Sequence, residues 1–136
     1  MVIRMGMVTK ARVLLAEDDS AQREILQELL ELEGYQVRVS TCSNELIAGL
    51  ADSPDAVLMD VVGVASTEVR RALGALRPRP AVLVVSGQPK LNEVAHWLGA
   101  DAFVCKPFDV SELLDALESA LRKRPSPVDG AQELTA

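Results

Sequence analysis

The sequence is poor in aromatic residues. Tyr35, Trp97, Phe103 and Phe108 are the only four among 136 residues. Aliphatic side chains must therefore build the core, and the chain has no set of rings on which nucleic-acid bases could stack. The charge also argues against nucleic-acid binding, because 20 acidic and 14 basic residues give a formal net charge of −6. We expect no direct binding to nucleic acid or to an anionic membrane surface.

Cysteine and long apolar segments are also scarce. Cys42 and Cys105 are too few and too far apart for a disulfide framework or a zinc site, and we expect two buried thiols in a reducing compartment. No stretch approaches the ~18–20 consecutive apolar residues of a membrane span. Residues 1–12 lack the continuous apolar segment of a signal peptide. The sequence therefore predicts a cytoplasmic protein.

The length predicts one folded domain with short ends, at ~100–200 residues per domain. We expect residues 1–10 to be a flexible N-terminal extension and residues 11–124 to form the domain. Residues 125–136 are polar and begin with Pro125-Ser126-Pro127, which predicts a flexible tail.

Short apolar runs alternate with helical patterns from residue 12 onward. The runs predict strands at 13–16, 36–40, 56–59, 81–85 and 102–105. Apolar residues at helical spacing follow each run and predict five helices. The run at 36–40 alternates polar and apolar residues, as expected for an edge strand. Together they predict an α/β fold of the flavodoxin-like class, a doubly wound, five-stranded parallel sheet in the order 2-1-3-4-5.

Charged and polar residues follow four of the predicted strands. In chain order they are Glu17, Asp18, Asp19, Asp60, Ser86 and Lys106. Because parallel strands end at the same edge of a sheet, these side chains should converge, and the carboxylates would repel one another without a cation. The set contains oxygen ligands and neither His nor Cys, which predicts a hard cation, Mg²⁺ or Mn²⁺.

Three members of this set suit a phosphoryl group. Asp60 could act as the nucleophile, Lys106 supplies a compact positive charge, and the Ser86 hydroxyl can donate to an oxyanion. Each residue alone is more commonly a helix cap, a turn residue or a solvated charge. The prediction therefore depends on their joint placement at the strand ends.

Four segments carry a resemblance to a known family. They are Val-Leu-Leu-Ala-Glu-Asp-Asp-Ser at 13–20, Leu-Met-Asp at 58–60, Val-Val-Ser-Gly at 84–87 and Gly-Ala-Asp-Ala-Phe-Val-Cys-Lys-Pro-Phe at 99–108. In this order and ending in Lys-Pro-Phe, they resemble the receiver domain of two-component response regulators. The resemblance covers residues 12–122.

The resemblance implies a metal site and a phosphoacceptor. Asp60 corresponds to the phosphoacceptor, and Glu17 with Asp18 corresponds to the acidic pair that holds Mg²⁺. In an alternative register the pair is Asp18 with Asp19. The backbone carbonyl of Val62 would be a further metal ligand.

The resemblance also implies a switch and its partners. Ser86 would be the hydroxyl that moves to the phosphoryl oxygen, Phe103 the aromatic side chain that moves with it, and Lys106 the lysine that pairs with the phosphate. The phosphoryl group would come from a phosphohistidine of a sensor histidine kinase or of a phosphotransfer protein.

Several function hypotheses remain open. The leading one is a stand-alone receiver that signals by contact with a downstream protein, as a monomer or a phosphorylation-dependent dimer; its chemistry is limited to self-catalysed phosphotransfer and dephosphorylation. The second is a phosphorylation-independent interaction module, since the segment 61–67 is shorter than in the family and lacks its proline. The third, a metal-dependent phosphatase, is disfavoured because Val62 stands where a second acid is expected.

Two residues outside these motifs have simpler interpretations. His96 has no second His or acidic residue at metal-ligand spacing, so we expect a surface residue on the fourth helix. Trp97 beside it should be either partly exposed or packed under the helix.

Overall fold

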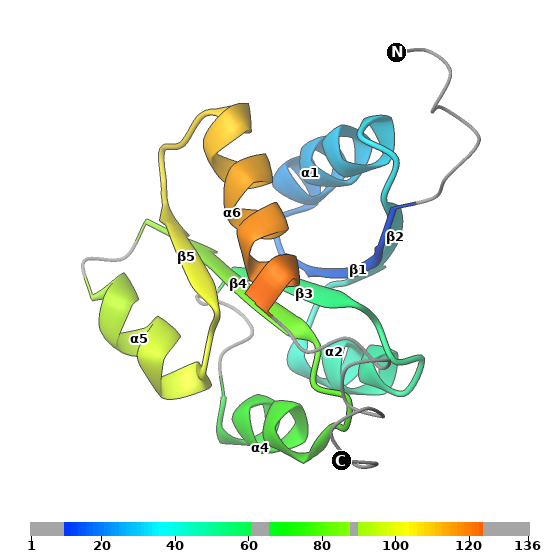
Figure 1. Ribbon diagram of the computed structural model, residues 1–136, viewed down its shortest axis with the longest axis vertical. Coiled ribbons are helices and arrows are strands. Elements are labelled where there is room, and N and C mark those ends of the chain that lie inside the picture. The colour runs from blue at the N-terminus through cyan, green and yellow to red at the C-terminus, as the bar shows by residue number, and fades with distance from the viewer. Residues whose placement is uncertain (1–9, 61–65, 88–89, 124–136) are drawn as a thin grey trace, which may run out of the picture.

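The computed structural model describes residues 10–60, 66–87 and 90–123 (Figure 1). The predicted extension, apart from Lys10, and the predicted tail lie outside the described residues. Within the described part, the backbone N–H of Lys10 donates to the Gly34 carbonyl at 3.1 Å, and its ammonium lies 5.1 Å from the centre of the Tyr35 ring.

A five-stranded parallel sheet forms the centre of the molecule. Its strands are β1 (Arg12–Ala16), β2 (Gln36–Ser40), β3 (Ala56–Asp60), β4 (Ala81–Ser86) and β5 (Ala102–Cys105). Their order across the sheet is β2-β1-β3-β4-β5, so the predicted order is confirmed. The central strands β3 and β4 are buried at every position, as parallel strands covered on both faces must be.

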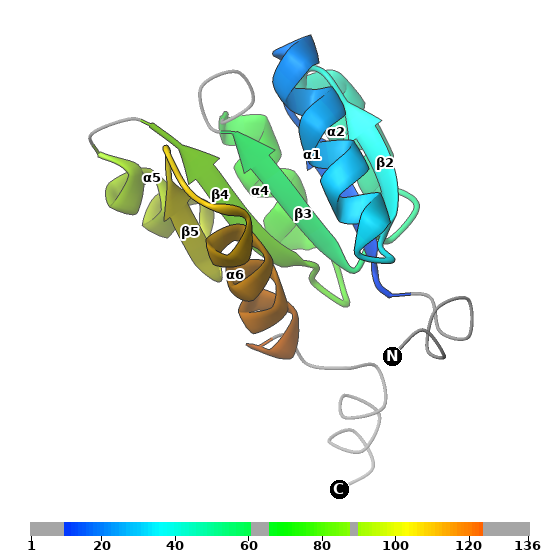
Figure 2. The same cartoon turned by 90° about the horizontal axis from the view of Figure 1, so that it is seen from above.

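Five helices of the described residues cover the sheet. They are α1 (Ser20–Leu32), α2 (Ser43–Leu50), α4 (Thr67–Ala75), α5 (Leu91–Leu98) and α6 (Val110–Lys123). Helices α1 and α6 lie on one face, and α2, α4 and α5 lie on the other (Figures 1 and 2). None of the described helices has the length and apolarity needed to cross a membrane.

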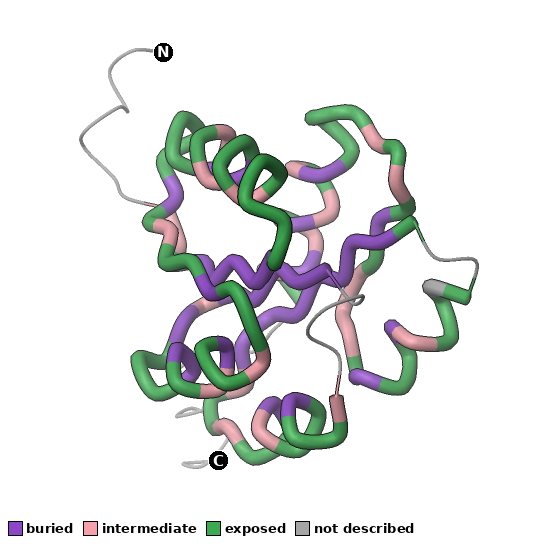
Figure 3. Tube along the Cα trace, turned by 180° about the vertical axis from the view of Figure 1, so that it is seen from behind, coloured by how far each residue is buried: buried purple, intermediate pink, exposed green. Residues whose placement is uncertain are grey.

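Alternate residues of each strand serve the two halves of the core. Leu14 and Val57 pack with α2, α4 and α5, whereas Val13, Leu15 and Leu58 pack with α1 and α6. Figure 3 shows the buried backbone running along the central strands and the sheet-facing sides of the helices. β2 has one buried residue among its five, which confirms the predicted edge strand.

Short polar side chains cap the beginnings of three helices, and a glycine follows the end of a fourth. The side chains of Asp19, Ser66 and Asp109 each accept a hydrogen bond from a backbone N–H in the first turn of α1, α4 and α6, at 2.9, 3.1 and 2.8 Å. Helix α5 ends at Gly99, whose φ of 75° lies in the left-handed region. These ends fix where each helix meets its strands.

The prediction of buried thiols is wrong. Cys42 and Cys105 are both free and exposed. Cys42 immediately precedes α2, and Cys105 ends β5, an edge strand in which Val104 is the only buried residue. An edge strand can expose alternate residues, and an apolar sequence pattern alone does not show this.

Two helical glycines provide a matched test of core packing. A Cβ added to Gly49 in α2 would lie 2.8 Å from Cδ1 of Leu14, which is 1% exposed, whereas one added to Gly74 in α4 would meet nothing within 4 Å. We expect Gly49→Ala to lower the free energy of unfolding by about 1–3 kcal/mol, since overpacking outweighs helix propensity. Gly74→Ala should raise it by up to about 1 kcal/mol. Urea titration followed by circular dichroism measures both, and stabilisation by Gly49→Ala would contradict the packing described.

Candidate functional site

Three charged side chains meet at the carboxyl edge of the sheet. Lys106, directly after β5, donates a hydrogen bond from Nζ to Oδ2 of Asp60 at 2.6 Å, and the same ammonium lies 3.7 Å from Oε1 of Glu17. Asp60 ends β3, and Glu17 directly follows β1. Asp60 and Glu17 are 7% and 2% exposed. The structure therefore brings together residues that are up to 89 positions apart, Glu17 and Lys106.

The electrostatics of this cluster leave a deficit of positive charge. Burial raises the pKa of the Glu17 carboxyl, and the negative charge of Asp60 and a hydrogen bond with the Asp18 carboxyl raise it further. The backbone N–H of Asp19, 3.2 Å from Glu17 Oε2, and the ammonium of Lys106 oppose this rise in pKa. Within the described residues, the two buried carboxylates both form ion pairs with the Lys106 ammonium, and a further cation would be favourable there.

The three consecutive acidic residues after β1 have different environments. Glu17 points into the cluster, while Asp19 is exposed and its Oδ1 caps α1. Asp18 is exposed, with its carboxyl beside that of Glu17. Of the two registers considered from the sequence, this geometry favours Glu17 with Asp18 as the acidic pair, since Asp19 serves as a helix cap.

Ser86 and Phe103 occupy neighbouring strands but differ in exposure. Ser86 ends β4 and is completely buried, and its carbonyl accepts a hydrogen bond from the backbone N–H of Lys106 at 2.9 Å. Phe103 lies on β5 and is 48% exposed. Ser86 therefore positions the backbone that carries Lys106. Val62, the predicted carbonyl ligand, lies outside the described residues.

Helix α1 contributes two further residues to the site. Gln22 accepts a hydrogen bond at Oε1 from Lys106 Nζ at 2.6 Å, and Arg23 donates to the Glu17 carbonyl at 3.0 Å. Gln22 is not among the site residues predicted from the sequence. The signal was available, because Gln22 lies in the first turn of a helix that begins at the carboxyl edge.

The donor set is compatible with a small hard cation. Among residues 10–60, 66–87 and 90–123, no three His, Cys, Asp or Glu side chains are grouped so that they could hold a metal ion. The expected four-carboxylate cluster is therefore reduced to Glu17 and Asp60, with Asp18 beside Glu17. Mg²⁺ is commonly bound through one or two carboxylates, with water and phosphate oxygens completing its shell. The chemistry of the pair fits that pattern.

Comparisons with known proteins point to one family. A family model described as "Response regulator receiver domain" matches residues 13–118. Response regulator MprA of Mycolicibacterium vanbaalenii is 36% identical over 130 residues, which cover 92% of this chain and 56% of that protein. MprA of Mycobacterium tuberculosis strain H37Rv is 34% identical over 128 residues, covering 90% and 55%. The chain spans about half the length of the curated relatives it matches.

Solved structures show the same fold. A CheY-like receiver domain protein from Methanospirillum hungatei superposes with a TM-score of 0.74 at 26% identity, covering 85% of this chain and 96% of that one. The non-phosphorylated HemR receiver domain from Leptospira biflexa superposes with a TM-score of 0.71 at 29% identity, covering 86% and 99%.

The raised pKa of Glu17 predicts a distinctive pH dependence of stability. A carboxyl whose pKa is higher in the folded state binds its proton more tightly there, so the free energy of unfolding falls as the pH rises from the unfolded value near 4.5 through the folded value. Glu17→Gln removes this loss. Without divalent cations, we expect the variant to be more stable than the wild type at pH 7, with a smaller difference at pH 4, in urea titrations.

The exposed Glu24 supplies the control for this measurement. Glu24→Gln makes the same chemical change at an exposed position on α1. The free energy of unfolding of this variant should vary with pH in parallel with that of the wild type. If the free energy of unfolding of Glu17→Gln also varied with pH in parallel with that of the wild type, burial would not raise the pKa of Glu17 as described.

Proposed function

This chain belongs to the response regulator receiver family, and we propose that it accepts a phosphoryl group on Asp60 from a phosphohistidine of a sensor histidine kinase or a phosphotransfer protein. The proposal rests on the buried Asp60 carboxylate at the carboxyl edge of the sheet, whose Oδ2 accepts a hydrogen bond from Lys106 Nζ at 2.6 Å. A ligand site at that edge is common in open α/β sheets.

The phosphotransfer requires little covalent chemistry from the protein. A carboxylate oxygen of Asp60 forms a bond to phosphorus while the phosphorus–nitrogen bond of phosphohistidine breaks, and the imidazole leaves with that electron pair. The Lys106 ammonium is close enough to stabilise the negative oxygens of the transferred group. Gln22, also bound to Lys106, would act as a positioning residue for the ammonium.

We assign the metal position to Glu17, Asp18 and Asp60, with the Val62 carbonyl as the proposed backbone ligand. Mg²⁺ bound there would neutralise charge on the phosphoryl oxygens. Support comes from the two buried carboxylates that share one ammonium. Mn²⁺ has the same preference for oxygen ligands.

The proposed switch uses Ser86 and Phe103. The Ser86 hydroxyl would donate to a phosphoryl oxygen on Asp60, and Phe103, now 48% exposed, would turn inward as that hydroxyl moves. The changed surface would then be recognised by a downstream protein, with the chain as a monomer or a phosphorylation-dependent dimer. Cytoplasmic, stand-alone action remains a prediction from the sequence.

Phosphorylation of Asp60 can be measured directly. Incubation with acetyl phosphate and Mg²⁺ should add one phosphoryl group to the wild type and none to Asp60→Asn, by intact mass spectrometry. Asp115→Asn, the same change at an exposed position on α6, should behave as the wild type. Equal modification of all three proteins would refute the assignment. Absence of modification in the wild type would favour the phosphorylation-independent interaction module.

Metal binding has a readout that does not depend on phosphotransfer. Millimolar Mg²⁺ should raise the midpoint of thermal unfolding of the wild type, because a ligand that binds only the folded state stabilises it. The increase should be strongly reduced in Glu17→Gln and retained in Glu24→Gln. A Mg²⁺-induced increase that is identical in all three proteins would place the cation elsewhere.

A further inference from the structure

Helices α4 and α5 border a groove that the phosphotransfer chemistry does not use. The groove has a volume of about 430 Å³, and its polar and aromatic lining comes from Arg70 and Arg71 of α4, His96 and Trp97 of α5, and Arg79 before β4. These five residues define what we call the arginine groove. As the sequence predicted, His96 is exposed, and Trp97 is 42% exposed, which is the first of the two positions expected for it.

The arginine groove lies away from the phosphotransfer site. Arg79 precedes the first residue of β4, whereas Ser86 is the last residue of that strand. A six-residue strand is about 20 Å long. A ligand in the groove therefore would not overlap the Asp60 site.

Positive charge is concentrated around this groove. Residues 66–80 contain Arg70, Arg71, Arg77 and Arg79 but only one acidic residue, Glu68, in a chain whose formal net charge is −6. The segment thus carries a net charge opposite in sign to that of the whole chain.

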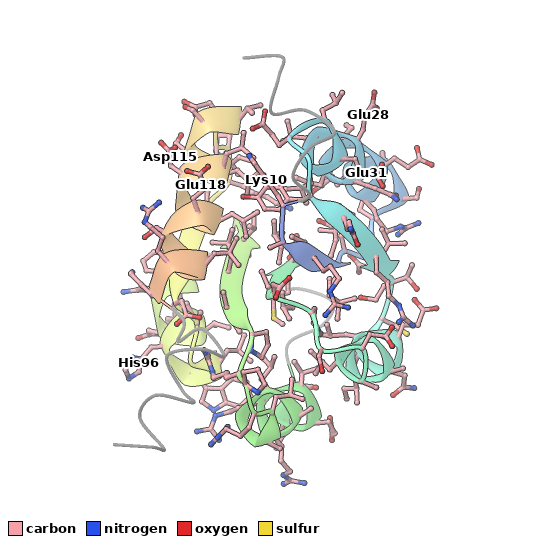
Figure 4. All side chains as sticks on the ribbon, turned by 45° about the vertical axis from the view of Figure 1, so that its right-hand side comes forward. Lys10, Glu28, Glu31, His96, Asp115 and Glu118 are labelled. Atoms are coloured by element: carbon pink, nitrogen blue, oxygen red, sulfur yellow. The ribbon has the colours of Figure 1, made fainter. Side chains whose placement is uncertain are left out.

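Acidic side chains are grouped on the other face of the sheet, whereas α4 and α5 carry one each, Glu68 and Glu93. Figure 4 shows Glu28 and Glu31 on α1 and Asp115 and Glu118 on α6, while His96 projects outward from α5. Helices α1 and α6 cover the other face of the sheet from α4 and α5. An approaching anion therefore meets a local field that the acidic helices do not cancel at short range.

Arg70 is held in a fixed orientation. Its Nε donates a hydrogen bond to the Trp97 carbonyl at 2.8 Å, and its guanidinium carbon lies 5.3 Å from the centre of the Trp97 ring. Stacking on the indole orders the side chain, while its two terminal nitrogens make no hydrogen bond with a described residue. An ordered guanidinium loses less entropy when it binds an oxyanion.

Arg71 adds a second positive charge that no carboxylate neutralises. It is exposed and makes no hydrogen bond or ion pair with any described residue. By contrast, Arg79 is paired with Asp101 at 3.1 Å. Arg70 and Arg71 therefore leave two uncompensated guanidinium groups on one rim of the groove.

From these observations we propose that the arginine groove binds a small ligand that carries two or more phosphate groups. Guanidinium groups bind phosphate oxygens through paired N–H donors, and two adjacent arginines can each engage one phosphate of a diphosphate. The volume lies within the about 300–1,000 Å³ typical of small-molecule sites. A protein segment would need an apolar anchor pocket, and the one exposed aromatic ring here already stacks with Arg70.

Trp97 provides a direct readout, because it is the only tryptophan of the chain. Sodium tripolyphosphate, titrated into the full chain without Mg²⁺, should change its fluorescence saturably, and isothermal calorimetry should give the same affinity. Arg71→Gln should weaken binding by about tenfold, the effect of losing one charge-assisted contact. Because Arg71 makes no hydrogen bond or ion pair with the part of the chain that the structure describes, this variant should fold normally.

Two controls distinguish specific binding in the arginine groove from nonspecific electrostatic attraction of an anion. Arg38→Gln removes one positive charge from β2, at the far edge of the sheet, and should leave the affinity unchanged. A hexaglutamate peptide should bind more weakly than tripolyphosphate. Absence of binding by calorimetry, equal weakening by the Arg71 and Arg38 variants, or equal affinity for the peptide would overturn the proposal. The last result would indicate a surface for acidic protein segments.

Discussion

The contact between Lys106 Nζ and Asp60 Oδ2 is the interaction on which the site depends. It joins the ends of β3 and β5 across β4. Together with Glu17, these residues place charged groups from three strand ends at one edge of the sheet, where both carboxylates are buried. Burial makes each carboxylate costly unless a cation accompanies it. Lys106 is the one cation paired with both carboxylates in the described part of the chain, which makes the edge suitable for a divalent cation and for a phosphoryl group that binds with it.

The parallel sheet explains why this arrangement could be anticipated from the sequence. Short apolar runs that end at Glu17 and Asp60 are typical of buried strands, and parallel strands bring such ends together. The edge position of β2 followed from its alternating pattern. Gln22 was missed because its role depends on where the first turn of α1 meets Lys106, a contact between residues 84 positions apart. The cysteine prediction failed because apolar composition does not distinguish the inner from the outer side of an edge strand, as Cys105 shows.

Charge also separates the molecule into regions with different chemistry. The carboxyl edge holds carboxylates that need a cation, while the groove between α4 and α5 holds Arg70 and Arg71, which form no ion pair with a described residue. The net charge of −6 conceals this division, since it sums over both regions. The ion pairs in each region decide what it can bind. Arg79 is ion-paired with Asp101, whereas Arg70 stacks on the Trp97 indole and forms no ion pair with a described residue.

The central claim is that the carboxylate of Asp60 receives the phosphoryl group. Its most direct test is to phosphorylate the chain from a phosphohistidine-containing phosphotransfer protein, reduce the product with borohydride and locate the modified residue by tandem mass spectrometry. An aspartyl phosphate is reduced to homoserine, so we expect homoserine at position 60 and at no other aspartate. Homoserine at another aspartate, or a stable phosphate on a hydroxyl side chain, would contradict it.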